Sequence, residues 1–347
     1  MELEVEISED DIADLNNAAV LNDVEAWLEA YGRIKVKDRS KGENGLMWLR
    51  DCKLGYLQRK ICKAIKWCLE NQKPIRLLVY KKRQTGASTG SVGIMRWFVN
   101  RFCMDALIIG AKSKQVQNLW EIYQTYHEND HFNWGHHENR LTTGTKLGNK
   151  SRIVHESLEG KEPGRSGTWT FLLATEVARW AEEGVKNASD TLTGISNGVP
   201  RDPLTCVIWE TTVRGGSGAF YEKWQGARTL EEFMAGDEGN GFIQIFEPWY
   251  EGFDSTMPVT DKERADILAG RGAADAQEAM REKEMMRKYN LTPEHIKYWR
   301  WALHDCQGDP DARDRDFPTT PEDGFRASVP GRFNSKTLGY LKDEALH

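Results

Sequence analysis

Residues 75–99 read IRLLVYKKRQTGASTGSVGIMRWFV, and this stretch decides the fold. Residues 75–80 have the length and apolar character of a buried β-strand, and residues 92–99 have those of a buried helix. Between them lies a short segment, 81–89, that contains Gly86. A strand, a tight turn and a helix N-terminus present free N–H groups and the positive end of a helix dipole to an anion. The stretch therefore predicts a phosphate-binding turn.

The turn departs from the standard phosphate loop, which reads G-x-x-x-x-G-K-[ST]. Gly86 fills the second glycine position and Ser88 fills the hydroxyl position. Ala87 stands where the lysine is expected, and Lys81 stands where the first glycine is expected. The turn is therefore either a damaged phosphate loop or a variant that takes its lysine from another position.

Composition narrows the class of protein. The chain has 347 residues, of which 39% are hydrophobic, and this favours one large or two ordinary soluble domains. No apolar run reaches the length of a membrane span, and the acidic segment 1–11 does not fit a secretory signal. The six cysteines include no C-x-x-C pair, which favours reduced thiols in a cytosolic compartment.

The net charge of −6 does not by itself indicate a nucleic-acid-binding protein. Lysines and arginines nevertheless concentrate between residues 53 and 83. This basic cluster is either a solvated helix face beside the turn or a surface that faces DNA or phosphate.

The rest of the pattern predicts an α/β fold. Helical spacing at 56–69 and 114–126 alternates with strand-like segments at 75–80, 104–110, 152–155, 169–174, 204–209 and 242–246, and 127–149 is expected to be a polar loop region. Such alternation favours a mainly parallel sheet covered by helices on both faces. From residue 260 onward the pattern is charged and helical, with Thr292 and Pro293 as the start of a helix. We therefore expect an arm at 1–50, a core at 51–258, a helical subdomain at 259–330 and the start of a linker at 331–347.

Two residues after the predicted strand at 169–174 are candidates for hydrolytic chemistry. Nucleotide hydrolases need an acidic residue at a strand end to hold Mg²⁺ through water, and a carboxylate to orient the attacking water. Thr175 stands at the first position, where it can bond a magnesium water without supplying charge, and Glu176 stands at the second. The same Thr-Glu pair is also an ordinary helix start.

Further candidates lie on loops. Arg165 stands between Gly164 and a Ser-Gly pair, which is either the setting of an arginine finger or a surface turn. Thr211 and Thr212 follow a predicted strand on the ligand side of the sheet, where they would sense a γ-phosphate or form a plain loop. Gln58 carries an amide that can pair with both a donor and an acceptor on an adenine edge.

The order of these motifs resembles the large terminase subunit of tailed bacteriophages, the motor that packages DNA. The segment K-x-R-Q-x-G-x-S-T is similar to the family's deviant Walker A motif, in which the lysine moves to the start of the loop. The resemblance covers most of the chain and includes FPTTPEDGF at 317–325, similar to a segment near the end of the family's ATPase region. It implies that Lys81 is the phosphate lysine, and a long ammonium side chain can reach the phosphates from either end of the loop.

The resemblance implies a P-loop NTPase fold of the RecA-like ASCE type with a helical lid, and ATP and Mg²⁺ as cofactors. It implies catalytic roles for Glu176 and a trans-acting Arg165, and a coupling role for Thr211 and Thr212. Mg²⁺ would be held by Ser88 and, through water, by Thr175. The implied ATP-binding residues are Gln58, Lys81, Arg83, Gln84, Thr85, Gly86, Ala87, Ser88 and Thr89.

The implied partners are double-stranded DNA, the portal protein and the small terminase subunit. A homo-oligomeric ring on the procapsid portal is expected in the host cytoplasm, with a monomer in isolation and no membrane contact. Large terminases usually carry a C-terminal nuclease as well, but no strand pattern follows residue 246. The aspartates at 309, 311, 314 and 316 lie in DPDARDRD, which is expected to be a solvated loop, so nuclease activity is not expected.

Two other functions fit the same residues. A helicase-like nucleic-acid ATPase would share the core but needs a second RecA-like lobe, for which the sequence shows no pattern. A degenerate phosphate-loop module for docking or DNA binding is favoured by Ala87 and Thr175, since both replace charged residues of the standard motifs.

Overall fold

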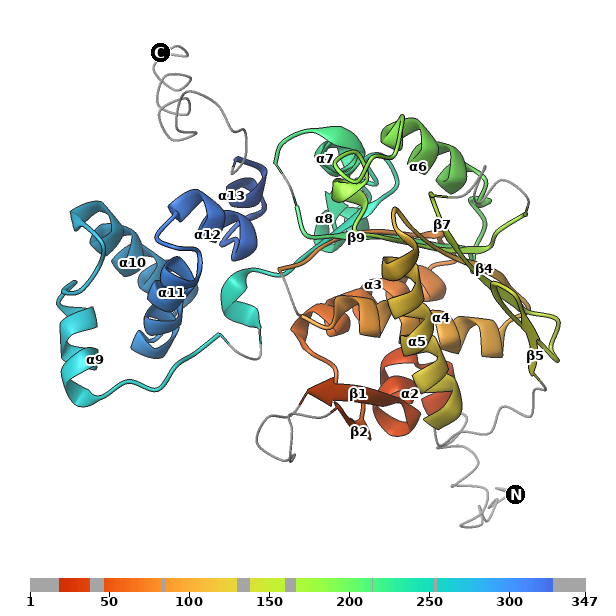
Figure 1. Cartoon of the computed structure of the whole chain (residues 1–347), viewed down its shortest axis with the longest axis horizontal. Coiled ribbons are helices and arrows are strands. Elements are labelled where there is room, and N and C mark those ends of the chain that lie inside the picture. Colours follow the sequence, from red (N-terminus) through yellow and green to blue (C-terminus); the bar gives the residue numbers. More distant parts are fainter. Residues whose placement is uncertain are drawn as a thin grey trace, which may run out of the picture.

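The computed structural model describes residues 19–37, 47–82, 85–129, 138–159, 167–213, 215–252 and 255–326. A nine-stranded sheet with helices on both faces forms the core, and a second group of helices lies beside it (Figure 1). The strand order is β10-β11-β3-β9-β8-β4-β7-β6-β5. All pairs from β10 to β7 are parallel, and β5, β6 and β7 pair antiparallel. The mainly parallel α/β sheet predicted from the sequence is confirmed.

The strands follow the predicted segments closely. The parallel strands are β3 (Ile75–Tyr80), β4 (Asp105–Gly110), β7 (Arg152–Ser157), β8 (Phe171–Thr175), β9 (Cys206–Thr211), β10 (Arg228–Thr229) and β11 (Ile243–Phe246). Side chains alternate between the two faces, as strand geometry requires. In β3, Leu77 and Val79 enter one apolar cluster while Leu78 and Tyr80 enter the other. Both faces of the sheet are therefore buried.

Different helices cover the two faces. The cluster that contains Leu77 is covered by α2 (Val24–Tyr31), α3 (Tyr56–Glu70), α4 (Ala87–Arg101), α5 (Ser113–Asn129) and α8 (Leu230–Met234). The cluster that contains Leu78 is covered by η1 (Val177–Arg179), α6 (Ala188–Asn197) and α7 (Gly218–Gly226). Figure 1 shows α3, α4 and α5 below the sheet and α6 and α7 above it.

The described part of the expected N-terminal arm packs against the core. The Asp23 carboxylate accepts the N–H groups of Glu25 and Ala26 and so caps α2. Trp27 and Leu28 are fully buried in the same cluster as α3 and α4. A short antiparallel pair follows, formed by β1 (Arg33–Lys37) and β2 (Met47–Asp51).

The expected polar loop at 127–149 contains regular structure, so that prediction was wrong in part. α5 continues to Asn129, and β5 (Glu138–Leu141) and β6 (Gly144–Leu147) form an antiparallel hairpin beside β7. These strands lie at the edge of the sheet, and their sequences, ENRL and GTKL, lack the apolar run that marks the central strands.

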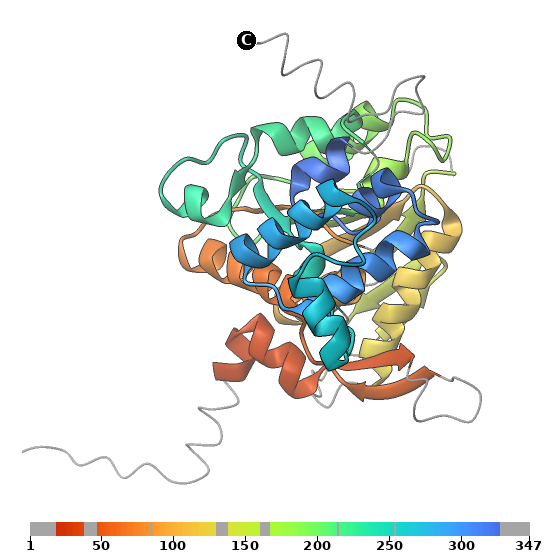
Figure 2. The ribbon, with the colours of Figure 1, turned by 90° about the vertical axis from the view of Figure 1, so that its left-hand side faces the viewer.

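The predicted helical subdomain is called the lid below, and all the regular structure among its described residues is helical. It contains α9 (Asp261–Leu268), α10 (Ala276–Tyr289), α11 (Pro293–Asp305), α12 (Pro310–Asp316) and α13 (Pro321–Arg326). Thr292 is the N-cap of α11 and Pro293 its first residue, as predicted. Trp249 of η2 (Trp249–Glu251) packs into the lid's own apolar cluster with Trp299. Figure 2 shows the lid in front of the sheet.

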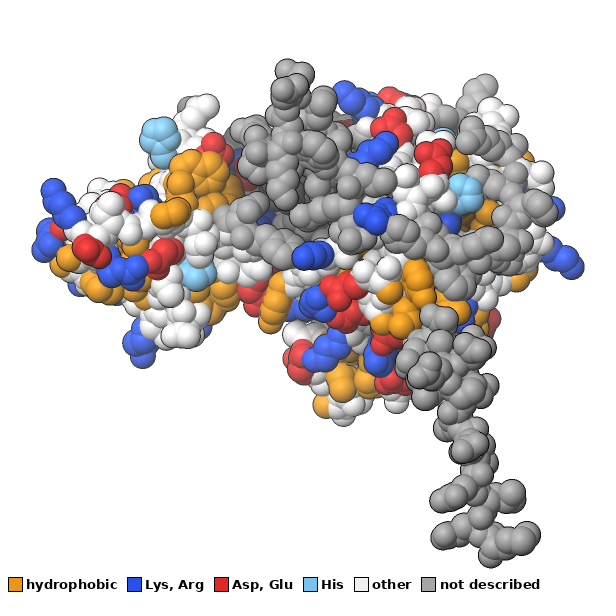
Figure 3. Space-filling view, turned by 90° about the horizontal axis from the view of Figure 1, so that it is seen from below, with side chains coloured by type: hydrophobic (Ala, Val, Ile, Leu, Met, Phe, Trp, Pro, Cys, Tyr) orange, Lys and Arg blue, Asp and Glu red, His pale blue; other side chains and the backbone are white. Residues whose placement is uncertain are grey.

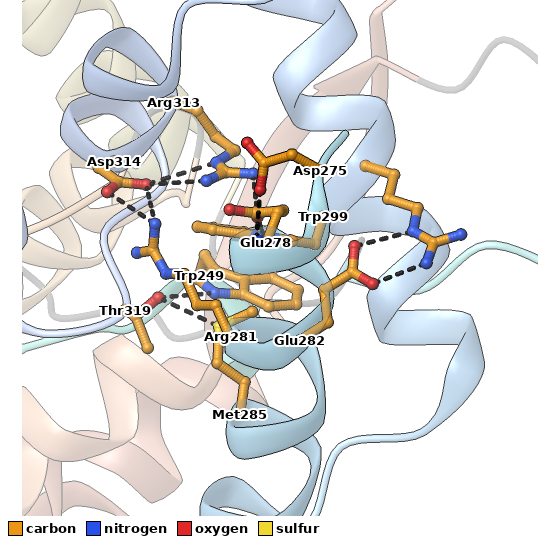
Figure 4. A network of polar contacts seen from close by, with 11 residues as sticks. Trp249, Asp275, Glu278, Arg281, Glu282, Met285, Trp299, Arg313, Asp314 and Thr319 are labelled. Atoms are coloured by element: carbon orange, nitrogen blue, oxygen red, sulfur yellow. Dashed lines mark hydrogen bonds and ion pairs between the residues drawn. The ribbon is translucent and has the colours of Figure 1, made fainter. Parts of the chain in front are cut away.

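An ion-pair network holds the lid helices together (Figure 4). The Arg313 guanidinium donates to Glu278 Oε1 at 2.6 Å and lies 3.8 Å from the ring centre of Trp299. Arg281 pairs with Asp314 at 2.9 Å. The expectation that DPDARDRD is a solvated loop was therefore wrong, because residues 310–316 form a helix and Arg313 is only 1% exposed. Stacking on Trp299 and ion pairs with the carboxylates offset the free energy that Arg313 loses when it is removed from water.

The lid is fastened to the core at the end of β3. Phe325 of α13 packs against Tyr80, with ring centroids 5.5 Å apart. Lys82 donates to the backbone oxygen of Trp249 at 3.1 Å.

Seen from below, acidic and basic side chains are interspersed over both parts of the molecule (Figure 3). In the described part of the chain, no helix combines the length and apolar character that a membrane crossing demands.

Candidate nucleotide-binding site

The candidate site lies at the carboxyl ends of three neighbouring parallel strands. β9 runs between β3 and β8, and Glu210 on β9 is the register partner of both Val79 and Thr175. The residues that follow these strands, Lys81 and Glu176, therefore leave the sheet at the same edge. This edge is where parallel α/β sheets bind ligands.

The turn after β3 ends in a left-handed glycine at the start of α4. Gly86 has φ +72° and is the N-cap of α4. This left-handed conformation favours glycine, and a Cβ at Gly86 would lie 2.9 Å from Gln58 Nε2. Ala87 begins the helix as a buried residue, and Thr89 lies half-buried in its first turn. The first N–H groups of α4 have no partner within the helix, and no side chain caps it, which suits this helix start to an anion.

Lys81 places its ammonium group beside the start of α4. Its Nζ donates to Ser88 Oγ at 2.9 Å and lies 3.3 Å from Glu176 Oε1 and 3.4 Å from Glu210 Oε1. Burial alone would lower the pKa of Lys81, but the two carboxylates outweigh burial and raise it. Lys81 thus supplies a buried cation beside the start of α4, where Ala87 has no charged side chain.

Glu210 is the residue of this site that the sequence reasoning missed. It is 0% exposed, and its carboxylate accepts hydrogen bonds from Ser88 at 2.5 Å, Thr175 at 3.0 Å and Ser91 at 3.1 Å. The available signal was a glutamate at the end of the otherwise apolar run CVIWE. A charged side chain in a strand that is buried on both faces requires partners.

Glu176 lies in a strained conformation that turns it toward Lys81. Its φ of +52° places a non-glycine residue in the left-handed region, at a cost of about 1–3 kcal/mol. Its Oε2 accepts the N–H of Thr212 at 3.4 Å. Such strain collects at functional positions, where the surrounding structure holds it in place.

Thr211 and Thr212 link the end of β9 to the segment after β8. The Thr211 hydroxyl accepts the N–H of Ala178 at 3.2 Å and donates to the oxygen of Thr212 at 3.0 Å. Thr211 is also the last residue of β9, and its backbone oxygen accepts the N–H of Lys81. Glu176 therefore contacts Thr212 directly, and Thr211 contacts the 3-10 turn that follows Glu176.

Gln58 lies beneath the turn. Its Nε2 donates to Thr85 oxygen at 3.0 Å, while its Oε1 is buried and has no hydrogen-bond partner. Burial raises the pKa of Glu247 to about 7, whereas Lys82 and a hydrogen bond with Thr85 lower it. The buried Gln58 oxygen remains as an acceptor that a ligand can satisfy.

Three predicted site residues, Arg83, Gln84 and Arg165, lie outside the described residues. The basic cluster at 53–83 is largely paired with acidic residues. The pairs include Arg59 with Glu25 and Glu29, Lys60 with Glu251, Lys66 with Asp23, and Lys73 with Glu238. This pairing favours the solvated helix face over a surface that faces DNA.

The residues present fit a nucleotide-bound Mg²⁺. The described ranges contain no group of three His, Cys, Asp or Glu residues arranged for a metal ion. A magnesium ion on a nucleotide needs few protein ligands, because phosphate oxygens and water fill most positions. The Ser88 hydroxyl and the Glu210 carboxylate are oxygen donors of the required kind, and they touch each other at the turn.

No protein-family model matches the chain, and no curated protein matches it. Among solved structures, the chain is similar to the large terminase ATPase domain of Thermus phage P74-26, with 14% identity, 77% of this chain and 93% of that chain covered, and a TM-score of 0.41. It is similar to the large terminase of the thermophilic bacteriophage D6E in complex with ATP-gamma-S, with 9% identity, coverage of 64% and 50%, and a TM-score of 0.40. It is also similar to the UvsW helicase of bacteriophage T4, with 13% identity, coverage of 63% and 65%, and a TM-score of 0.36.

Proposed function

We propose that this chain is the ATPase motor domain of a phage terminase large subunit, which couples ATP hydrolysis to translocation of double-stranded DNA into a procapsid. The observation that carries the proposal is the position of Lys81. Its ammonium lies 2.9 Å from Ser88 Oγ at the start of α4, between two carboxylates. The position of this ammonium supports Lys81 as the phosphate lysine. A damaged phosphate loop would not require a buried cation at the start of α4.

The proposal assigns a role to each residue of the site. The N–H groups around Gly86 and the Lys81 ammonium bind the phosphates. When bound, Mg²⁺ supplies charge neutralisation to the phosphates, with Ser88 as its ligand and Thr175 reaching it through water. Glu176 orients the attacking water and receives its proton. Gln58 contacts the adenine, and Arg165 completes the site of a neighbouring subunit.

Coupling runs through the contacts of Glu176. Thr212 N–H binds the Glu176 carboxylate, and Thr211 binds the backbone of η1. Lys82, adjacent to Lys81, is tied to the lid through Trp249. A movement of Lys81 on phosphate binding would therefore reach the lid through Lys82 and Trp249. The partners in this proposal are DNA, the portal protein, the small terminase subunit and further copies in a ring, at the procapsid in the host cytoplasm.

A nucleotide-binding titration with a matched pair of variants tests the proposal. Lys81→Ala removes the ammonium after β3, and Lys73→Ala removes an exposed lysine at the opposite end of the same strand. Losing a charge-assisted hydrogen bond to phosphate should weaken ATP binding about tenfold or more in the first variant, with no change in the second. ATP binding that is absent in the wild type, or unaffected by Lys81→Ala, would instead support a degenerate docking module.

DNA translocation needs its own measurement. ATP hydrolysis by the isolated chain should be slow and should rise on assembly with procapsid portals, because Arg165 acts on a neighbouring subunit. Packaging of DNA into procapsids, scored as nuclease-protected DNA, should require Lys81 and Glu176. Hydrolysis that supports unwinding but no packaging would favour the helicase-like alternative.

A further inference from the structure

The negative charge that Thr175 lacks is present one strand away. Thr175 ends β8 at the position where phosphate-loop hydrolases carry an acidic residue for Mg²⁺. Glu210 is its register partner on β9, and the two side chains are joined by a hydrogen bond of 3.0 Å. The same Glu210 oxygen accepts the Ser88 hydroxyl at 2.5 Å. A carboxylate therefore lies between the strand end and the hydroxyl of the turn.

Stability alone does not account for Glu210. A buried ion pair is often no more stabilising than apolar residues of the same volume, because both charges lose their water. Glu210 is nevertheless 0% exposed within an apolar strand, and three hydroxyl groups donate to it. Two of these hydroxyls, from Ser88 and Ser91, belong to the helix that follows the turn. The arrangement is built around the candidate phosphate site and not around the apolar core.

The charges at this place favour a further cation. Glu176 and Glu210 share the single ammonium of Lys81, at 3.3 Å and 3.4 Å. Two negative charges and one positive charge leave a net charge of −1 over these three groups. If Lys81 engages phosphate, Glu210 loses part of its compensation and needs another positive partner.

We propose that Glu210 is the carboxylate that positions nucleotide-bound Mg²⁺ in this chain, in the role that Thr175 cannot fill for lack of charge. The inference rests on the proposed nucleotide-binding function of the site. Glu210 acts from the neighbouring strand by accepting hydrogen bonds from waters of the ion and from its ligand Ser88. It is a positioning residue, since Ser88 and the phosphates supply the direct contacts.

The test measures how strongly Mg²⁺ tightens nucleotide binding, and it needs no hydrolysis. The full chain is titrated with ATP-gamma-S in Mg²⁺ and in EDTA, and the ratio of the two dissociation constants is the magnesium coupling. Glu210→Gln should reduce this ratio about ten- to a hundredfold, as for other residues that orient metal ligands. Affinity in EDTA should stay the same or rise, because a negative charge near the phosphates is removed.

Two further variants make the result specific. Glu238→Gln removes a carboxylate that pairs with Lys73 at the opposite end of β3, and it should leave the magnesium coupling unchanged. Thr175→Asp combined with Glu210→Gln returns a carboxylate to the adjacent strand end, and it should restore the coupling. An unaltered ratio in folded Glu210→Gln overturns the inference and leaves the proposed function standing. A wild-type chain that binds no nucleotide overturns the proposed function itself.

Circular dichroism establishes whether Glu210→Gln is folded. If it is not, Glu210→Asp takes its place, because it keeps the charge and withdraws the carboxylate by one methylene. A reduced coupling in Glu210→Asp supports the inference, and an unchanged coupling overturns it.

Discussion

Thr175 and Glu210 are register partners on adjacent parallel strands, and the Thr175 hydroxyl donates to the Glu210 carboxylate at 3.0 Å. Thr175→Val keeps the shape of the side chain and removes this donor. Glu210 then keeps its bonds to Ser88 and Ser91 but loses one partner of a fully buried charge. The free energy of unfolding in urea should fall by about 1–3 kcal/mol. A loss below the error of the measurement would show that the bond contributes nothing.

Glu176→Gln should separate nucleotide binding from hydrolysis. The amide keeps the size of the side chain and the ability to accept the Thr212 N–H, but it cannot take a proton from water. We expect ATP affinity within about threefold of wild type, because Lys81 keeps Glu210 as its partner when the charge of Glu176 is removed. Single-turnover hydrolysis should fall about 10²- to 10⁴-fold. Hydrolysis at the wild-type rate would show that Glu176 takes no part in the reaction.

The local parts of this molecule were predictable because each depends on neighbouring residues. The run 75–80 is a strand as expected, Gly86 adopts φ +72°, and Thr292 and Pro293 begin α11. Strand, turn and cap signals are carried by residues that touch along the chain. The contact between Lys81 and Ser88 is local in the same sense, because only seven positions separate the two residues in the sequence.

The missed residues depend on contacts that are distant in sequence. Glu210 meets Ser88 and Thr175 only because β9 lies between β3 and β8, and a single sequence does not give that strand order. Arg313 was misjudged for the same reason. Its partners Glu278 and Trp299 come from two other helices, so the charged segment looked solvated when taken alone.

Arg313→Ala should destabilise the lid strongly. Arg313 is only 1% exposed, and its removal leaves Glu278 without its ion-pair partner, while Asp314 keeps only Arg281. Removing one partner of a buried pair costs about 3–5 kcal/mol, and urea unfolding followed by tryptophan fluorescence should show this loss. Arg271→Ala is the matched control, because the Arg271 side chain is 64% exposed where it pairs with Asp266. This substitution should lower the free energy of unfolding by less than about 1 kcal/mol. Equal losses in the two variants would contradict the buried network.

Glu247 should make the stability of the chain fall as the pH rises. Burial raises the pKa of this carboxyl from 4.5 to about 7, so between these values the folded chain holds a proton that the unfolded chain has released. The stabilisation is fully present below about pH 4.5 and is lost as the pH rises through 7, by at most about 3 kcal/mol. Glu247→Gln stays neutral at every pH. The difference in unfolding free energy between the two chains should therefore grow from pH 5 to pH 8, and a constant difference would contradict the raised pKa.

The docking of α13 on the core should show a strong coupling between Gly324 and Tyr80. A Cβ at Gly324 would lie 1.6 Å from the Tyr80 hydroxyl and 2.9 Å from Cζ of the same ring, so Gly324→Ala must displace the helix or the ring. We expect a loss of about 1–3 kcal/mol in unfolding free energy. Tyr80→Phe alone should be close to neutral or stabilising, because the Tyr80 hydroxyl is buried without a hydrogen-bond partner.

The double variant decides whether this contact is the cause. Tyr80→Phe removes the atom nearest to the new methyl group and leaves the ring carbon at 2.9 Å, so it should recover part of the loss caused by Gly324→Ala. The interaction energy from the cycle should be about 0.5–3 kcal/mol in favour of the double variant. Additive losses would mean that the methyl group is accommodated by movement of α13 away from β3. Phe325 would then lose its packing against the ring at position 80 in both variants that carry Gly324→Ala.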